Sequence, residues 1–204
     1  MIYVVDCPGN DSYAFRERPA LTEYQEIHQT IIPDMSGESR VGVRRCEACG
    51  ELLAKWEEPL ESLVVKEQRF DISCTYDGVD VVSERFKSVF VEQNLRGLTF
   101  RSLSNSPSFY AVWATRVVEF DAERRGTRFE NRCDVCGQHE SVVGATPVYL
   151  KQGTNIEHDE FVRTDLEFAS NDEKHPLLLC GDAAAAVLRR SKLKGLDLTP
   201  AERS

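Results

Sequence analysis

The sequence predicts an α+β fold of two pseudo-repeated halves that meet at a four-cysteine, zinc-ribbon-like centre, for three reasons. The motif Cys-x-x-Cys-Gly occurs at 46–50 and again at 133–137. Each copy precedes patterns typical of strands and then of one amphipathic helix. The passage 177–198 also aligns with 79–100 without a gap, at a shift of 98 residues. Each half is therefore expected to contain a cysteine turn, strands, a helix and a final strand.

Length and composition are those of a globular protein with a sizeable core. The chain has 204 residues, of which 41% are hydrophobic and 29% charged, and it contains no low-complexity tract. Ser, Asn and Pro are concentrated at 102–108, which is the best candidate boundary between the halves. We therefore expect halves at 1–103 and 104–204, packed as one compact domain.

Local patterns place the elements within each half. In the first half they predict a strand over 2–5, a short helix before Pro33, a strand over 69–76 and a helix from Ser83 to Leu95. Thr22 and Gln25 have capping-box spacing at the start of the first helix, and Gly97 stands where a C-terminal cap of the second is expected. In the second half they predict a long strand over 109–120, strands at 127–132, 142–143, 148–150 and 161–168, and a helix that begins near Asp182.

The paired cysteines have the spacing of ligands to a structural metal. A Cys-x-x-Cys-Gly turn places two thiolates close enough for one ion, and its glycine allows the positive φ that such a turn often requires. Two turns complete one tetrahedral shell. The expected ligands of a structural Zn²⁺ are Cys46, Cys49, Cys133 and Cys136. Because 83 residues separate Cys49 from Cys133, one shared ion would bind the two halves together.

A redox dithiol is the alternative interpretation of these motifs, because Cys-x-x-Cys also serves thiol exchange. Zinc is favoured because the motif occurs twice and neither copy lies between a strand and a long helix. His139, two residues after Gly137, could replace one thiolate, although four cysteines already suffice. The chain has seven cysteines, and this odd number argues against a complete disulfide framework. The remaining three, Cys7, Cys74 and Cys180, are expected to be buried.

The charge of the chain limits its partners. Its formal net charge of −9 repels a phosphate backbone and attracts basic surfaces, so nucleic acid is not an expected partner.

The first residues lack the basic segment of a signal peptide, and no stretch approaches the roughly 20 apolar residues of a membrane span. We expect a cytoplasmic protein without membrane contact, in a compartment where thiols stay reduced.

Both cysteine motifs, together with the passage from Ser83 to Phe100, resemble the double-CxxCG motif protein family. Some members of that family are regarded as immunity proteins of polymorphic toxin systems. The likeness extends from about Val41 onward, and the twin motifs are its specific part. The residues that carry over are Cys46, Cys49, Gly50, Cys133, Cys136 and Gly137. The resemblance implies a non-catalytic, zinc-binding protein that binds and neutralises a cognate bacterial toxin protein.

Acidic clusters are candidates for the surface that binds such a toxin, because complementary charges speed association with a basic target. The residues expected on this surface are Glu157, Asp159, Glu160, Asp172 and Glu173. Most charge runs are only solvated, so this expectation depends on the resemblance.

Two other functional classes are alternatives. A zinc-ribbon module that binds nucleic acid or regulates another protein also uses paired cysteine turns, but the net charge of −9 and the lack of a basic stripe count against it. An enzyme is the third class, yet the sequence has no Gly-rich phosphate loop, no Gly-x-Ser-x-Gly elbow and no His-Glu-x-x-His. A four-cysteine zinc site is coordinatively closed, so no catalytic residues are expected.

Overall fold

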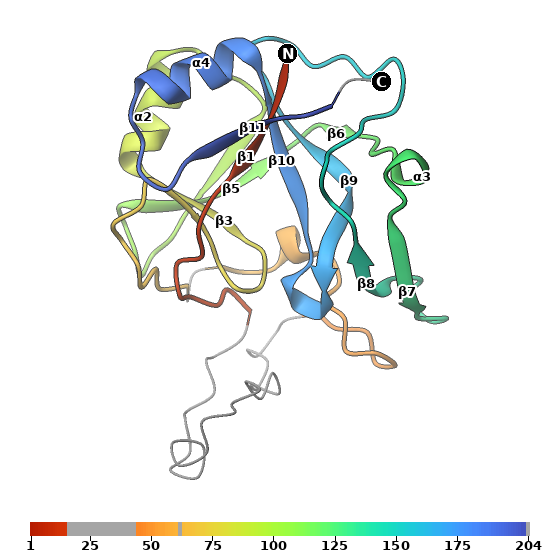
Figure 1. Ribbon diagram of the computed structural model, residues 1–204. Helices are drawn as coiled ribbons and strands as arrows, with labels where there is room; N and C mark the ends of the chain where they lie inside the picture. Colours follow the sequence, from red (N-terminus) through yellow and green to blue (C-terminus); the bar gives the residue numbers. More distant parts are fainter. Residues whose placement is uncertain (16–43, 61–62, 203–204) are drawn as a thin grey trace, which may run out of the picture.

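The computed structural model describes residues 1–15, 44–60 and 63–202. The short helix predicted before Pro33 lies outside the described residues. Within them the chain forms two sheets and a few short helices (Figure 1). This sheet-rich architecture is compatible with the predicted α+β class.

Strands dominate the order of elements along the chain, and η1 and η2 are single 3₁₀ turns. The elements are β1 (Ile2–Asp6), η1 (Lys55–Glu57), β2 (Ile72–Cys74), β3 (Asp80–Ser83), α2 (Glu84–Glu92), β4 (Leu98–Ser102), β5 (Phe109–Ala114), β6 (Val117–Val118), α3 (Ala122–Arg125), β7 (Arg128–Arg132), β8 (His139–Val143), β9 (Phe161–Ser170), η2 (Asn171–Glu173), β10 (His175–Gly181), α4 (Asp182–Arg190) and β11 (Asp197–Pro200).

The two sheets differ in size and in the parts of the chain that form them. The smaller has the strand order β2-β3-β5-β4, and all its neighbouring strands pair antiparallel. The larger has the order β11-β1-β10-β9-β8-β7, with β6 beside β9. Its pairs are antiparallel except that β6 runs parallel to β9. The strand nearest the N-terminus therefore completes a sheet built from the later part of the chain.

The stretch predicted as the boundary between halves forms the turn of a hairpin. β4 and β5 pair on either side of it, with Ser102 opposite Tyr110. After β5 the chain crosses to the larger sheet, where Val117 of β6 pairs with Arg163 of β9. The single strand predicted over 109–120 is wrong, because β5 and β6 belong to different sheets.

The strand order β2-β3-β5-β4 has a counterpart in the order β9-β10-β1-β11 within the larger sheet. We call β2 to β5 with α2 the first unit, and β9, β10, α4, β11 and β1 the second unit. Helices α2 and α4 both have nine residues and begin 98 residues apart. The strand registers correspond as well. The matching pairs are Val82 with Ile72 and Tyr110 in the first unit, and Cys180 with Phe161 and Tyr3 in the second.

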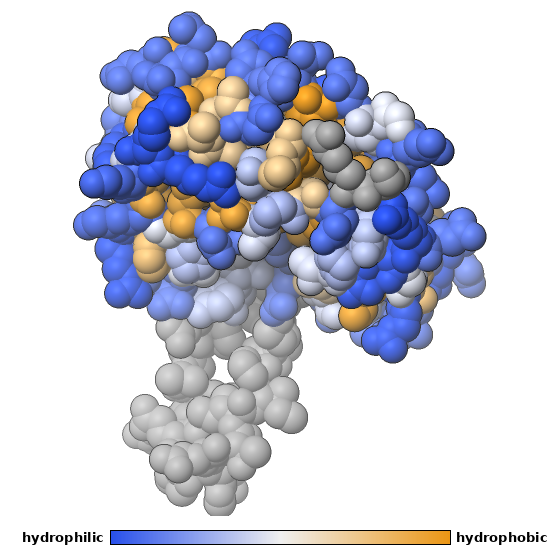
Figure 2. Space-filling model, turned by 45° about the horizontal axis from the view of Figure 1, so that its top comes forward, coloured by the Kyte–Doolittle hydropathy of each residue, from blue (hydrophilic) through white to orange (hydrophobic). Residues whose placement is uncertain are grey.

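Hydrophobic side chains from both helices and both sheets share one core. Phe86 and Phe90 of α2 belong to the same cluster as Ala184 and Leu188 of α4, together with Phe161 of β9. Figure 1 shows the two helices next to each other on one side of the molecule. Figure 2 shows a face that is mostly hydrophilic, with hydrophobic residues gathered near its middle. Because α2 belongs to the first unit and α4 to the second, the core that they share joins the two units.

A second core lies on the opposite face of the smaller sheet. Val81 packs in it with Leu60 and Leu63 of the segment 52–65. Its neighbour Val82 belongs to the first core. Successive residues of a strand point to opposite faces, so the described residues of this segment, 52–60 and 63–65, cover the face that the helices leave open. This segment directly follows the first cysteine turn.

A pair of glycines marks where the two units touch. Gly97 has a φ of +95°, and a Cβ there would lie 2.1 Å from the backbone oxygen of Phe161. Gly195 has a φ of +80°, and its Cβ would lie 2.4 Å from the backbone oxygen of Ile72. Only glycine allows both this conformation and so close an approach. Gly97 is therefore a packing residue and not the predicted cap, since the C-cap of α2 is Gln93.

Candidate metal centre

Each cysteine motif forms a tight turn closed by backbone hydrogen bonds. The N–H of Gly50 donates to the oxygen of Cys46 at 2.8 Å, and the N–H of Cys46 donates to the oxygen of Glu51 at 2.9 Å. Gly50 has a φ of +75°, which accounts for glycine at the end of the motif. The corresponding bonds of the second turn run from Gly137 to Cys133 at 2.9 Å and from Cys133 to Gln138 at 2.8 Å.

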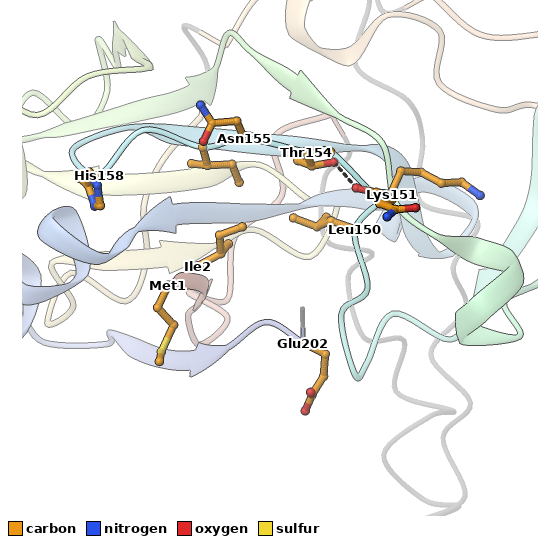
Figure 3. A pocket seen from close by; sticks show the side chains of 11 residues that line it. Met1, Ile2, Leu150, Lys151, Thr154, Asn155, His158 and Glu202 are labelled. Carbon is orange, nitrogen blue, oxygen red and sulfur yellow. Dashed lines mark hydrogen bonds between the residues drawn. The ribbon is translucent and has the colours of Figure 1, made fainter. Parts of the chain in front are cut away.

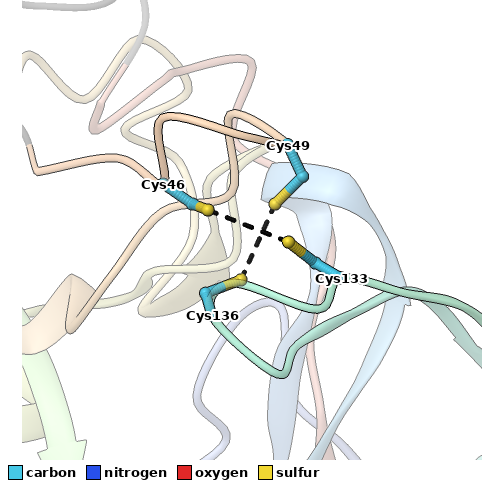
Figure 4. A group of neighbouring side chains, drawn as sticks. All are labelled: Cys46, Cys49, Cys133 and Cys136. Carbon is cyan, nitrogen blue, oxygen red and sulfur yellow. Dashed lines mark hydrogen bonds between the residues drawn. The ribbon is translucent and has the colours of Figure 1, made fainter.

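The two turns face each other, and their side chains point toward a common centre (Figure 4). The Sγ atoms of Cys46 and Cys133 lie 3.9 Å apart, and those of Cys49 and Cys136 lie 3.7 Å apart. All four sulfur atoms lie within 4.8 Å of one another. Cys46 is buried and Cys49 exposed, while the other two are half-buried. The four cysteines named from the sequence could therefore hold one metal ion.

Backbone N–H groups favour the thiolate form of the first cysteine in each turn. A hydrogen bond from the N–H of Cys136 lowers the pKa of Cys133 to about 7. A hydrogen bond from the N–H of Cys49 likewise lowers the pKa of Cys46 below its ordinary value. Because the thiolate is the form that binds metals, the shape of each turn prepares one ligand.

The other candidate sulfur and imidazole groups lie elsewhere. His139 is not part of the cluster, and its ring contacts that of Phe129 at 5.2 Å between centroids. Cys180 is buried as predicted, whereas Cys7 and Cys74 are only half-buried. Burial raises the pKa of Cys180 to about 12 and also raises the pKa values of Cys7 and Cys74. These three thiols are therefore protonated at neutral pH.

An ion pair holds the first turn against the hairpin between β9 and β10. The Arg45 guanidinium donates two hydrogen bonds to the Asp172 carboxylate, both at 2.9 Å. It also donates to the backbone oxygen of Gly50 at 2.7 Å. Asp172 is only 3% exposed. Asp172 was expected on the partner surface, but it is an interior carboxylate that positions the metal centre.

Two buried lysines extend this support to both turns. The Lys55 ammonium donates to three backbone oxygens at 3.1, 2.6 and 2.5 Å. Lys174 forms an ion pair with Glu51 at 3.1 Å and donates to the backbone oxygen of His139. Burial lowers the pKa of Lys55 and raises that of Glu51. Sequence reasoning missed these lysines, because neither lies in a motif and lysine is rarely buried without such partners.

The remaining acidic residues expected at a partner surface lie in the loop before β9 and at the end of η2. Asp159 forms an ion pair with Arg96 at 2.6 Å, and Glu160 forms one with Arg116 at 2.5 Å. The exposed members of the set are Glu157 and Glu173. Two of the five predicted residues are thus free of these ion pairs and open to solvent.

A hollow of about 340 Å³ lies beside β1, away from the cysteines (Figure 3). Ile2 and Leu150 form apolar parts of its wall, and Thr154 and His158 are polar. The Thr154 hydroxyl donates to a neighbouring backbone oxygen at 2.7 Å, and His158 Nδ1 lies 2.5 Å from the carboxylate of Asp182. These polar groups are already paired within the chain.

None of the described helices combines the length and apolar character needed to cross a bilayer. Comparisons with family models, with curated proteins and with solved structures found no match to this chain. The fold and the cysteine cluster together define the class of this protein. It is an α+β protein in which two cysteine turns, far apart in sequence, form a candidate metal centre.

Proposed function

We propose that the four cysteines hold one structural zinc ion. Zn–S bonds of about 2.3 Å in a tetrahedron place the sulfur atoms about 3.8 Å from one another. The two distances between the turns, 3.9 and 3.7 Å, agree with this value. Four thiolates close the coordination shell, so this ion would stabilise the fold and would not activate water.

We also infer that the two units are repeats related by an approximate twofold axis. The matching strand orders, registers and helix lengths support this. Their mutual contacts are reciprocal too. The N–H of Phe161 donates to the oxygen of Arg96 at 2.8 Å, and the N–H of Ile72 donates to the oxygen of Lys194 at 3.3 Å. Arg96 and Lys194 are again 98 residues apart.

We propose that the protein is a cytoplasmic immunity protein that binds and neutralises a cognate bacterial toxin and catalyses nothing itself. The observation that carries this proposal is the four-cysteine cluster, because a zinc ion held there by four thiolates would have no open coordination position for catalysis. The resemblance to the double-CxxCG motif family supplies the toxin as partner. The exposed carboxylates of Glu157 and Glu173 and the net charge of −9 would speed encounter with a basic target.

Co-expression with the product of the adjacent gene tests this function. We expect the neighbour to be toxic alone, co-expression to restore growth, and the two proteins to purify together. A neighbour that is harmless alone and does not co-purify would remove the basis of the proposal. The double variant Glu157→Gln/Glu173→Gln should slow association at low salt and leave the fold intact. The double variant Glu67→Gln/Glu92→Gln removes the same number of charges elsewhere in the chain and serves as the control.

A zinc-ribbon module for nucleic acid is the second candidate function, because paired cysteine turns are common in such modules. Titrations with duplex and single-stranded DNA and RNA at several salt concentrations distinguish the two. Binding that weakens steeply with salt would favour this candidate, and no binding at low salt would exclude it.

A further inference from the structure

A hollow of about 270 Å³ borders the candidate metal centre. The chain has only two tryptophans, Trp56 and Trp113, and both line this hollow, with ring centroids 3.6 Å apart. The Arg163 guanidinium covers the Trp113 ring, its Cζ 4.0 Å from the centroid. Glu51 and Gln138, which follow the first and second cysteine turns, form further parts of the wall. The hollow is thus built from both turns and both sheets.

The Arg163 guanidinium has hydrogen-bond donors in this hollow that lack acceptors among the described residues. Arg163 uses its Nε to donate to the oxygen of Ala114 at 3.1 Å. Among the described residues, the Glu167 carboxylate acts on the Arg163 guanidinium through space, without a hydrogen bond. The two Nη groups of Arg163 make no hydrogen bond to a described residue, so a ligand that offers acceptors can bond them.

The other cations in the hollow are already neutralised or bonded. Lys174 pairs with Glu51, and Lys55 donates to three backbone oxygens. Arg163 is different, because no carboxylate is hydrogen-bonded to it. Burial lowers the pKa of its guanidinium, and Glu167 raises that pKa through space alone. Arg163 is therefore the lining cation with charge and donors left for a ligand.

We propose that this hollow binds a small organic carboxylate. The carboxylate oxygens accept hydrogen bonds from the Arg163 guanidinium, and the apolar part of the ligand lies against the aromatic wall. The volume of about 270 Å³ is close to the lower end of the roughly 300–1,000 Å³ of ligand pockets, which suits a molecule of the size of benzoate. This inference goes beyond toxin binding and does not depend on it.

Titration of the intact protein with benzoate tests the inference, because the fluorescence of both tryptophans reports on this one hollow. Benzamide has nearly the same shape without the charge, so it is the matched control ligand. We expect benzoate to change the emission saturably, with a Kd at least about tenfold lower than that of benzamide, since a charged acceptor bonds a guanidinium more strongly. Calorimetric titration checks the same affinities without an optical signal.

Two substitutions in the hollow are expected to act in opposite directions. Arg163→Gln removes the cation and should raise the Kd for benzoate about tenfold, whereas Glu167→Gln removes a like charge and should lower it. Trp56→Phe keeps an aromatic ring in the wall and should leave the Kd for benzoate unchanged, because the shielded N–H of Trp56 does not face the ligand. Arg189→Gln is the matched control, because Arg189 stacks on a tyrosine ring elsewhere, at 4.4 Å, and benzoate binding should not change.

Urea denaturation establishes that each variant is folded, and Arg163→Lys replaces Arg163→Gln if the latter is not, since lysine keeps the charge and loses the planar fork. No saturable change with benzoate at about 10 mM, far above the Kd of an ordinary ligand, overturns the inference and leaves the hollow to water. Equal affinity for benzamide also overturns it. Tighter binding by Arg163→Gln with weaker binding by Glu167→Gln does so too.

Discussion

Gly97 and Gly195 make the same contact in opposite directions, each facing the first residue of a strand in the other unit. An added Cβ would lie 2.1 Å from the oxygen of Phe161 in one case and 2.4 Å from that of Ile72 in the other. The close approach of the two units therefore depends on two positions without side chains. Neither glycine could be exchanged without moving a strand.

Alanine at either position should be strongly destabilising. Gly97→Ala and Gly195→Ala are each expected to lower the free energy of unfolding by about 3 kcal/mol or more, because backbone strain and a clash add together. Gly153→Ala is the control, since Gly153 has a φ of +84° but nothing within 4 Å of an added Cβ. It should cost about 1 kcal/mol. If urea denaturation gave the same loss of free energy of unfolding at all three positions, the contact between the units would contribute nothing to stability.

Loss of one cysteine should release the metal. Metal analysis of the purified protein is expected to find one zinc per chain, and Cys133→Ser should lose it and unfold at lower temperature, because bound metal supplies folding free energy. Cys7→Ser is the matched control, since Cys7 lies outside the cluster. A Cys133→Ser protein with the zinc content of the parent would rule out the shared site.

The ion pair between Arg45 and Asp172 should be worth more than an exposed pair. Asp172→Ala is expected to cost about 3–5 kcal/mol, because it leaves a largely buried guanidinium without its carboxylate. Glu67→Ala breaks an exposed pair with Arg69 and should cost less than about 1 kcal/mol. The double variant Arg45→Ala/Asp172→Ala should cost less than the two single changes together. Additive effects in this cycle would mean that the two side chains are not coupled.

Asp80 should make the stability of the fold depend on pH. Burial raises its pKa to about 6 from the usual 3.8, so the folded state holds this proton more tightly than the unfolded state. The favourable contribution is present below about pH 4 and is lost as the pH rises to about 6. Above pH 7 the buried charge should cost about 3 kcal/mol.

Asp80→Asn is therefore expected to change the free energy of unfolding more favourably at pH 8 than at pH 4. Urea denaturation of parent and variant across this range measures the difference, and the subtraction cancels any pH dependence of metal binding. A constant difference between the two proteins from pH 4 to pH 8 would contradict the raised pKa of Asp80.

Local signals in the sequence located the starts of α2 and α4 and the two cysteine turns, although they did not predict the short helix α3. Ser83 caps α2 as predicted, because its Oγ accepts a hydrogen bond from the N–H of Phe86 at 3.2 Å. Asp182 begins α4, also as predicted. These features depend on residues within one turn of each other, and the four clustered cysteines belong to motifs of equally short range.

Long-range features could not be predicted in the same way. The residues of β1 read as a strand, but nothing local places that strand between β10 and β11. The stretch 109–120 is rich in aromatic and β-branched residues on both sides of the point where the chain passes from one sheet to the other. Nothing in the sequence around Lys55 and Lys174 distinguishes them from surface lysines. They can be buried because distant segments supply oxygens to their ammonium groups.

The position of β1 also sets an order of assembly. Val4 pairs with Leu179 on one side and with Thr199 on the other, so both neighbours of this strand are synthesised long after it. The strands of the first unit follow one another along the chain and can associate as soon as they leave the ribosome. A nascent chain would then carry a finished first unit beside a strand with two unpaired edges, open to wrong partners until the last segments emerge.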